Sequence, residues 1–148
     1  MRESLVKNVP VLHRRLWRIT RGRLGWRFGE LEFCLLTTIG HHSGREHTTP
    51  LVLIRDTSCL ALVASNGGSN RQPDWFLNLV QNPRITLETK NAREEKIARV
   101  ATDPEREVLW PMTQRVYAGY GAYQHKTNRV IPIVILEEDS SSSVSKSS

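Results

Sequence analysis

Short apolar segments that follow one another with few helical interruptions constrain the fold of this chain more than any other feature. These strand candidates span residues 31–40, 48–56, 59–65, 84–89, 94–100 and 131–137. Helical patterns occupy only residues 74–80, 103–116 and 120–126. Strands that are joined directly pair most easily as antiparallel neighbours. We therefore predict an α+β, mainly β fold in which the sheet closes or half-closes into a barrel.

The chain of 148 residues has room for one domain with its own core. We place a barrel domain at residues 30–138, after an N-terminal arm of residues 1–29 and before a tail of residues 139–148. The tail, DSSSSVSKSS, has too few apolar side chains to pack, so we expect it to be disordered.

The net charge of +6 is concentrated in the arm. Residues 1–29 carry eight Lys and Arg side chains and one Glu, which gives +7 there and leaves −1 for the other residues. Within the arm, Val9, Leu12, Leu16 and Ile19 recur at helical spacing beside arginines, which predicts a basic amphipathic helix. Such a helix could lie on an anionic membrane surface or pack on its own domain. Because the domain is nearly neutral, the sequence argues against nucleic-acid binding.

The expected location follows from three features of the sequence. No apolar run approaches the roughly 20 residues of a membrane-spanning helix, and the N-terminus lacks the apolar stretch of a secretory signal. The cysteines, Cys34 and Cys59, lie in apolar runs, which is typical of buried thiols in a reducing compartment. We therefore expect a cytoplasmic protein, with peripheral attachment at the inner face of the cell membrane as the alternative.

Residues 40–50, GHHSGREHTTP, form a polar turn between two predicted strands. Small residues expose backbone N–H groups there, and cationic and hydroxyl side chains beside them suit an anion such as phosphate. His41 and His42 would point in opposite directions, and no carboxylate accompanies them at metal-ligand spacing, so we predict no metal site. A plain solvated hairpin turn is the alternative.

Residues 64–79, ASNGGSNRQPDWFLNL, follow a predicted buried strand. The Gly-Gly pair lets the backbone approach a flat ligand closely, and the start of the following helix attracts negative charge. Trp75 and Phe76 add aromatic surface. The alternative is a loop whose aromatic side chains close the end of the barrel.

Residues 117–124, YAGYGAYQ, place a tyrosine at every third position. On a helix Tyr117, Tyr120 and Tyr123 share roughly one face. Their hydroxyl groups need partners when buried, so this face is either core or the wall of a wet pocket. No common nucleotide-binding glycine motif and no Ser-His-Asp order accompanies it.

Together these three segments resemble the deazaflavin-dependent nitroreductase family, whose members are also described as F420H2-dependent quinone reductases. The resemblance rests on LLTTIGHHSGREHTTPL (residues 35–51), LVASNGGSNRQPDWFLNLVQNPRI (62–85) and VYAGYGAYQHKTNRVIPIVILE (116–137). It implies a split β-barrel like that of FMN-binding oxidases, with coenzyme F420 as the cofactor. It also implies an oxidoreductase that transfers a hydride from reduced F420 to a quinone or nitroaromatic acceptor.

The same resemblance assigns roles to individual residues. The implied cofactor-binding residues are His41, His42, Ser43, His47, Thr48, Thr49, Pro50, Leu51, Val63, Ala64, Ser65, Asn66, Trp75, Asn78 and Tyr120. The implied catalytic residues are Tyr120, Ser65, Tyr117 and Tyr123. We expect Tyr120 to hydrogen-bond the acceptor oxygen or to supply a proton, with Ser65 as the second candidate.

The polar turn departs from the family pattern, which often has Arg-Lys in place of His41-His42 and Arg in place of His47. Because imidazole titrates between about pH 5 and 8, we expect weaker and pH-dependent binding of the cofactor. Two alternative functions remain open: an F420-binding or storage protein with little turnover, and an FMN-binding or haem-binding split barrel. Related split barrels are often dimeric, so a homodimer is a further expectation.

Overall fold

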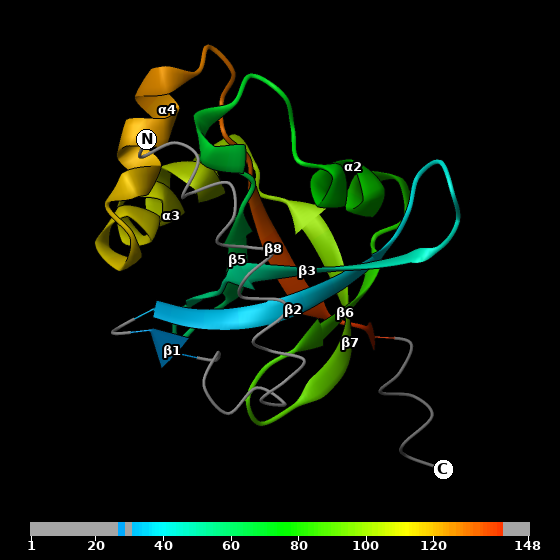
Figure 1. The fold of residues 1–148 in the computed structure, drawn as a ribbon. Coiled ribbons are helices and arrows are strands. Elements are labelled where there is room, and N and C mark those ends of the chain that lie inside the picture. Colours follow the sequence, from blue (N-terminus) through cyan, green and yellow to red (C-terminus); the bar gives the residue numbers. More distant parts are fainter. Residues whose placement is uncertain (1–26, 29–30, 141–148) are drawn as a thin grey trace.

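The computed structural model describes residues 27–28 and 31–140. The predicted amphipathic helix of the arm and the predicted tail from residue 141 onward lie outside the described residues. The described part forms an antiparallel sheet that curls around an apolar interior, and its helices gather over one end of the sheet (Figure 1).

Eight strands are assigned among the described residues, and every pairing between them is antiparallel. They are β1 (Arg27–Phe28), β2 (Leu31–Ile39), β3 (Glu46–Val52), β4 (Ile54–Arg55), β5 (Leu60–Val63), β6 (Arg84–Glu88), β7 (Arg93–Val100) and β8 (Ile133–Glu138). The order along the sheet is β1-β2-β6-β7-β8-β5-β4, and β3 pairs with β2 off this path. The mainly β architecture that the sequence predicted is confirmed.

The helical segments of the described part are η1 (Asn66–Gly68), α2 (Asp74–Gln81), α3 (Asp103–Val116) and α4 (Gly119–Lys126). α3 and α4 lie side by side, η1 lies against α4, and α2 packs on β2 and β7 (Figure 1). The loop that contains η1 and the helix that carries the tyrosines are therefore neighbours in space.

The segment predicted as one strand over residues 48–56 is divided at Leu53 into β3, which pairs with β2, and β4, which pairs with β5. Leu53 is buried, and its N–H donates to the Glu32 carbonyl (2.8 Å), the next position of the β2–β3 register. The N-cap of α3 is Thr102. Thr102 Oγ1 accepts from the Glu105 N–H (3.4 Å) and Glu105 Oε1 accepts from the Thr102 N–H (2.9 Å), which forms a capping box.

The core has two compartments because β5 and β8 are buried on both faces. Leu62 of β5 belongs to a cluster inside the sheet that α2 covers, whereas its neighbour Ala61 belongs to a cluster that α3 and α4 cover. Side chains alternate across a strand, so a strand buried on both faces must be apolar throughout. Cys34 is buried in the first cluster as expected, but Cys59 is only half-buried.

The sheet and its packing extend past both predicted ends of the domain. Arg27–Phe28, which the sequence analysis assigned to the arm, form β1 and pair with β2. Asp139, assigned to the tail, is 5% exposed, and its carboxylate lies 3.1 Å from the Arg84 guanidinium. Among the described residues, no helix is both long and apolar enough to cross a membrane.

Candidate functional site

One buried amide fastens the polar turn between β2 and β3 to α2. Asn78 Oδ1 accepts hydrogen bonds from the His41 N–H (2.9 Å) and from His41 Nδ1 (2.5 Å), and Asn78 Nδ2 donates to Thr38 Oγ1 (3.0 Å). Because a backbone N–H can only donate, the amide oxygen of Asn78 must face His41, and His41 Nδ1 must carry a proton. Nε2 of His41 is therefore the ring nitrogen that can face a ligand.

The outer part of this turn offers donors for an anion. His42, Ser43 and Arg45 are exposed, and Ser43 Oγ lies 3.2 Å from His47 Nε2. Gly40 permits this arrangement, because a Cβ at that position would lie 2.5 Å from Ser43 Oγ and 2.8 Å from His47 Nε2. Imidazole, hydroxyl and guanidinium groups together suit a phosphate.

The next predicted contacts, Thr48, Thr49, Pro50 and Leu51, are half-buried residues of β3 that pair with β2. The hydroxyl of Thr48 lies 2.8 Å from that of Thr37 across the two strands. These residues therefore continue the turn into the sheet.

The loop after β5 has a backbone conformation that few residues adopt. Val63 and Ala64 are buried, and Ser65 is half-buried with no capping hydrogen bond from its hydroxyl to η1. Residues 66–68 all have left-handed φ values, 46°, 63° and 81°. Two of these residues are glycines, as such a conformation favours. The Gly-Gly pair noted in the sequence is thus required by the backbone.

Arg129, which follows α4 and which the sequence analysis did not single out, holds this loop. It donates to the carbonyl oxygens of Ala64 (3.1 Å), Ser65 (2.9 Å) and Ser69 (2.9 Å) and to Gln72 Oε1 (2.8 Å). One side chain thereby gathers four points of a nine-residue stretch.

The start of α2 buries its aromatic residues. Trp75 and Phe76 are 7% and 8% exposed and pack edge to face, with ring centroids 6.3 Å apart. Both belong to the cluster inside the sheet. Trp75, a predicted cofactor contact, therefore presents little surface to a ligand, and Asn78 uses its amide on protein groups.

The three tyrosines form one cluster but do not share a helix, because Tyr117 is the C-cap of α3 and only Tyr120 and Tyr123 belong to α4. The ring of Tyr120 lies 5.0 Å from that of Tyr117 and 6.4 Å from that of Tyr123, measured between centroids. The hydroxyls of Tyr117 and Tyr123 are 3.2 Å apart. Tyr120 is 5% exposed, and its hydroxyl has no hydrogen-bond partner among the described residues.

The hydroxyls of Tyr120 and Tyr123 stay protonated at neutral pH. Burial raises the pKa of Tyr120. Burial, together with the hydrogen bond to Tyr117, raises the pKa of Tyr123 to about 12. Both groups are therefore neutral hydrogen-bond donors and not phenolates.

Residues 64–79 link the tyrosine cluster to the polar turn. A Cβ on Gly68 would lie 3.1 Å from the Tyr123 backbone, and Thr127 Oγ1, just after α4, donates to Asn70 Oδ1 (2.7 Å). At its other end the segment reaches the polar turn through Asn78 and His41. The three segments that the sequence singled out thus form one continuous region.

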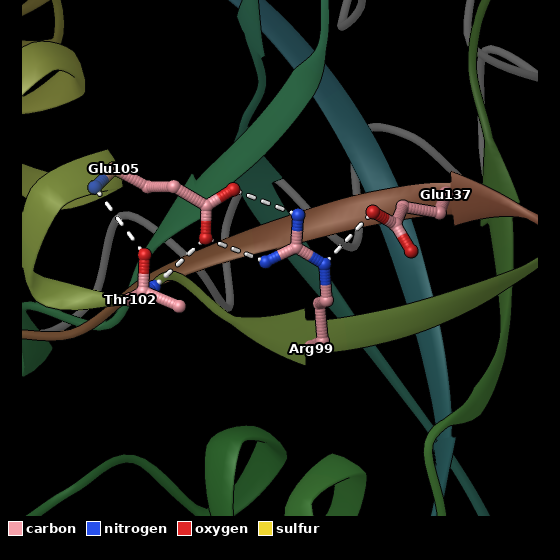
Figure 2. Close-up of polar contacts among 4 residues, drawn as sticks. All are labelled: Arg99, Thr102, Glu105 and Glu137. Carbon is pink, nitrogen blue, oxygen red and sulfur yellow. Dashed lines mark hydrogen bonds and ion pairs between the residues drawn. The ribbon is translucent and has the colours of Figure 1, made fainter.

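A groove of about 820 Å³ lies elsewhere, between the turn after β4, strands β7 and β8, and the start of α3. Arg99 on its wall already pairs with both Glu105 and Glu137 (Figure 2). Because these three side chains together carry one excess negative charge, the groove suits an anionic ligand less well than the polar turn does.

Comparison with known proteins decides the family. The model of the F420H(2)-dependent quinone reductase family matches residues 11–138. The chain belongs to this family. An F420H(2)-dependent quinone reductase of Mycobacterium tuberculosis is 36% identical over 129 residues, which cover 84% of this chain and 87% of the relative. The predicted family and the predicted class of oxidoreductase are confirmed.

Solved structures agree. An F420-H2 dependent reductase, FDR-A, is 34% identical to this quinone reductase family member. The two structures align with a TM-score of 0.65, over 71% of the present chain and 93% of the FDR-A chain. A chain described as a domain-swapped dimer is 30% identical, with a TM-score of 0.68 over 85% and 96%. The haem storage protein HutZ of Vibrio cholerae, at 13% identity and a TM-score of 0.52 over 82% and 88%, shares the fold alone. The split β-barrel is confirmed, and so is coenzyme F420 as the cofactor of the family.

The residues present fit an anionic cofactor. The polar turn supplies imidazole, hydroxyl and guanidinium donors, and the tyrosine cluster contains a phenol with no partner in the described part of the chain. Three further residues shape the site although no sequence pattern marks them, Thr38, Gln72 and Arg129. Only contacts between distant parts of the chain reveal them.

Proposed function

We propose that this chain transfers a hydride from reduced F420 to a quinone, in a site formed by the polar turn, the loop after β5 and the tyrosines of α4. The observation that carries the proposal is Tyr120, which is 5% exposed and whose hydroxyl has no partner among the described residues. This hydroxyl is therefore available to donate a hydrogen bond to a bound ligand.

The polar turn binds the anionic part of the cofactor in this proposal. His41 Nε2, His42 and Ser43 donate to it, and Asn78 holds His41 in place. The left-handed backbone of residues 66–68 allows the loop to approach a flat ring closely. Reduced deazaflavin supplies the hydride, because a carbon replaces the central nitrogen of a flavin.

The tyrosines manage the charge that develops on the acceptor. Reduction of a quinone places negative charge on its oxygen, and a positioned neutral donor stabilises that charge. Tyr120 is the first candidate because burial keeps it protonated. Tyr117 and Tyr123 share one hydrogen bond, so one of their two O–H groups remains able to donate. Ser65 is the second candidate.

Tyr120→Phe tests this assignment. We expect kcat/KM for menadione to fall on the order of 100-fold, because the variant loses one donor to the developing oxyanion. The Kd for F420 should change much less. Tyr117→Phe is the comparison, with a smaller expected loss, since Tyr123 can still donate. A folded Tyr120→Phe protein with wild-type turnover would show that the hydroxyl has no catalytic role.

The alternative functions separate in a binding experiment with the wild-type protein. Titration with F420, FMN and haem identifies the ligand, and steady-state reduction of menadione by F420H2 measures turnover. Binding of F420 without turnover would favour a storage protein, and preferential binding of FMN or haem would favour the other split-barrel functions. Nitroaromatic acceptors are compared with menadione in the same assay.

We also propose that the arm attaches this cytoplasmic protein to the inner face of the membrane, which is where quinones reside. The net charge of +7 on residues 1–29 supports this proposal. Full-length protein should sediment with vesicles that contain anionic lipid and not with neutral vesicles. Replacement of Arg14, Arg15 and Arg18 by Gln should weaken the attachment.

A relative forms a domain-swapped dimer, so we propose that this chain forms a homodimer. Light scattering of the full chain tests this proposal.

A further inference from the structure

We infer that Arg129 is a positioning residue that holds the loop of residues 64–72 at a fixed distance from the tyrosines of α4. Its importance for catalysis rests on the proposed function, whereas its effect on the loop does not. The guanidinium uses Nη2 for the carbonyls of Ala64 and Ser65, Nε for the carbonyl of Ser69, and Nη1 for Gln72. Four of its five N–H groups are therefore committed to this loop.

The loop depends on these contacts because it belongs to no ladder. The carbonyl of Ser65 accepts from the Gly68 N–H (2.9 Å) as well as from Arg129, and the Asn66 carbonyl accepts from the Ser69 N–H (3.1 Å). Besides these two turns, the loop has internal hydrogen bonds from Asn66 Nδ2 to the Arg71 carbonyl (3.0 Å) and from the Arg71 N–H to Ser69 Oγ (3.2 Å). Arg129 connects both ends of this short turn to the body of the protein.

The main chain of Arg129 is tied to the tyrosine helix. Gln124, in the last turn of α4, donates from Nε2 to the Arg129 carbonyl (2.7 Å). Thr127 Oγ1 accepts from the Arg129 N–H (3.4 Å) and donates to Asn70 in the loop (2.7 Å). The backbone of Arg129 is thus fixed to the helix of Tyr120 and Tyr123, and its side chain is fixed to the loop of Ser65. It bridges the two walls of the site.

The four groups that accept hydrogen bonds from the Arg129 side chain, three backbone carbonyls and one side-chain amide, are all neutral. Burial lowers the pKa of Arg129. A surface arginine is usually placed to pair with a carboxylate, so this arrangement favours the planar fork over the charge. Lysine has the charge but presents its donors from one point, and it cannot span carbonyls of residues 64, 65 and 69 together. Arg129→Lys should therefore fail almost as completely as Arg129→Gln.

Hydrogen exchange of the full-length protein without cofactor tests the clamp directly. In Arg129→Gln we expect the amides of Gly68 and Ser69 to exchange about tenfold faster, as the loss of charge-assisted hydrogen bonds implies. Exchange within α3 should be unchanged. Arg99→Gln is the matched control, because it removes a guanidinium with three hydrogen bonds to Glu105 and Glu137 outside the site. That control should leave exchange in the loop unchanged.

Kinetic measurements on the same variants form the second part of the test. Arg129→Gln and Arg129→Lys should lower kcat/KM for menadione on the order of 100-fold, because a misplacement of about 1 Å has that effect. Their Kd for F420 should rise, while Arg99→Gln keeps both values. Loop exchange that is unchanged in both Arg129 variants would overturn the inference, and so would a full rescue by Lys.

If the wild type reduces no quinone, the proposed function fails, and the exchange data still decide the role of Arg129. If Arg129→Gln does not fold, Arg129→Lys and the milder Gln72→Ala carry the comparison.

Discussion

Arg99 and Arg129 each fasten distant segments together, but their partners differ. Arg99, on β7, donates from Nε to Glu137 of β8 (2.8 Å) and from Nη1 and Nη2 to Glu105 of α3 (2.7 and 2.8 Å), as Figure 2 shows. The Arg129 side chain makes four hydrogen bonds, all to carbonyl and amide oxygens. One arginine balances charge at a surface, and the other organises an irregular loop beside the candidate site.

The two arrangements contribute differently to stability. The side chains of Arg99 and Glu137 are 39% and 47% exposed, and ion pairs of that kind contribute about 0–1 kcal/mol because water and salt screen them. When the ion pair is broken, water can hydrogen-bond to the exposed groups that remain. Water reaches a buried group poorly, so a buried group that loses its hydrogen-bond partner stays desolvated and unpaired.

The hydrogen bonds that Asn78 makes between α2 and the polar turn also join buried, uncharged partners. Asn78 is 3% exposed, and Thr38, its partner on β2, is 1% exposed. The networks around Asn78 and Arg129, whose acceptors are all uncharged, both lie along the proposed site, whereas the ion-pair network of Arg99 lies at the start of α3. We expect the networks with uncharged acceptors to fix the geometry of the site and the ion-pair network to add a little stability.

The largest effect that separates the two kinds of network is expected at Asn78. Asn78→Ala removes three hydrogen bonds and leaves the buried hydroxyl of Thr38 and the N–H of His41 unpaired. We expect the free energy of unfolding to fall by about 2–3 kcal/mol, measured by urea denaturation. Asn82→Ala, at the exposed C-cap of the same helix, is the control and should cost about 0.5 kcal/mol or less. Equal losses would contradict the distinction between buried and exposed partners.

The second effect is a pH dependence confined to the site. His41 Nδ1 is committed to Asn78, so Nε2 donates to an anion only when the ring is protonated. The F420 affinity should therefore fall about tenfold as the pH rises from 6 to 8, because a charge-assisted donor is lost. The hydrogen bonds to Arg99 lower the pKa of Glu105 to about 2, so Glu105 stays ionised between pH 6 and 8.

Fluorescence titration of F420 against the full-length protein at both pH values checks this expectation. His41→Gln should bind F420 with the same affinity at pH 6 and pH 8. His125→Gln, an exposed histidine near the end of α4, is the matched control and should keep the wild-type dependence. If His41→Gln keeps the dependence as well, His42 or His47 is the group that titrates.

Sequence patterns predicted the parts of the fold that local chemistry determines. Strands β2, β5, β6, β7 and β8 and helices α2, α3 and α4 all lie where apolar alternation and helical spacing placed them. Thr102 stands three residues before Glu105, and the structure uses this pair as a capping box at the start of α3. The division of the predicted strand at Leu53 could not be predicted, because it reflects a change of partner strand, from β2 for β3 to β5 for β4.

The candidate site was predicted less completely, for a physical reason. The three segments were found because each is unusual in composition, and the tyrosine cluster and the loop are in fact neighbours. The sequence predicts which residue types are present but not which groups they bond. Asn78 was expected to contact the cofactor, yet its amide is used by residues 37 and 40 positions away in sequence. Arg129 bonds carbonyls 60 to 65 positions away, and no periodic pattern reports a contact of that kind.

The smallest expected effect concerns salt. Arg99→Gln should lower the free energy of unfolding by about 1 kcal/mol or less at low ionic strength. Raising the salt concentration to about 1 M should remove most of that difference, because the screening length falls to about 3 Å. The loss in Arg129→Gln should persist at high salt, because its carbonyl and amide partners carry no net charge. Urea denaturation of the wild type and both variants at two salt concentrations gives the comparison. If salt removes the two losses equally, Arg129 acts through its charge, and the contrast between the two arginines disappears.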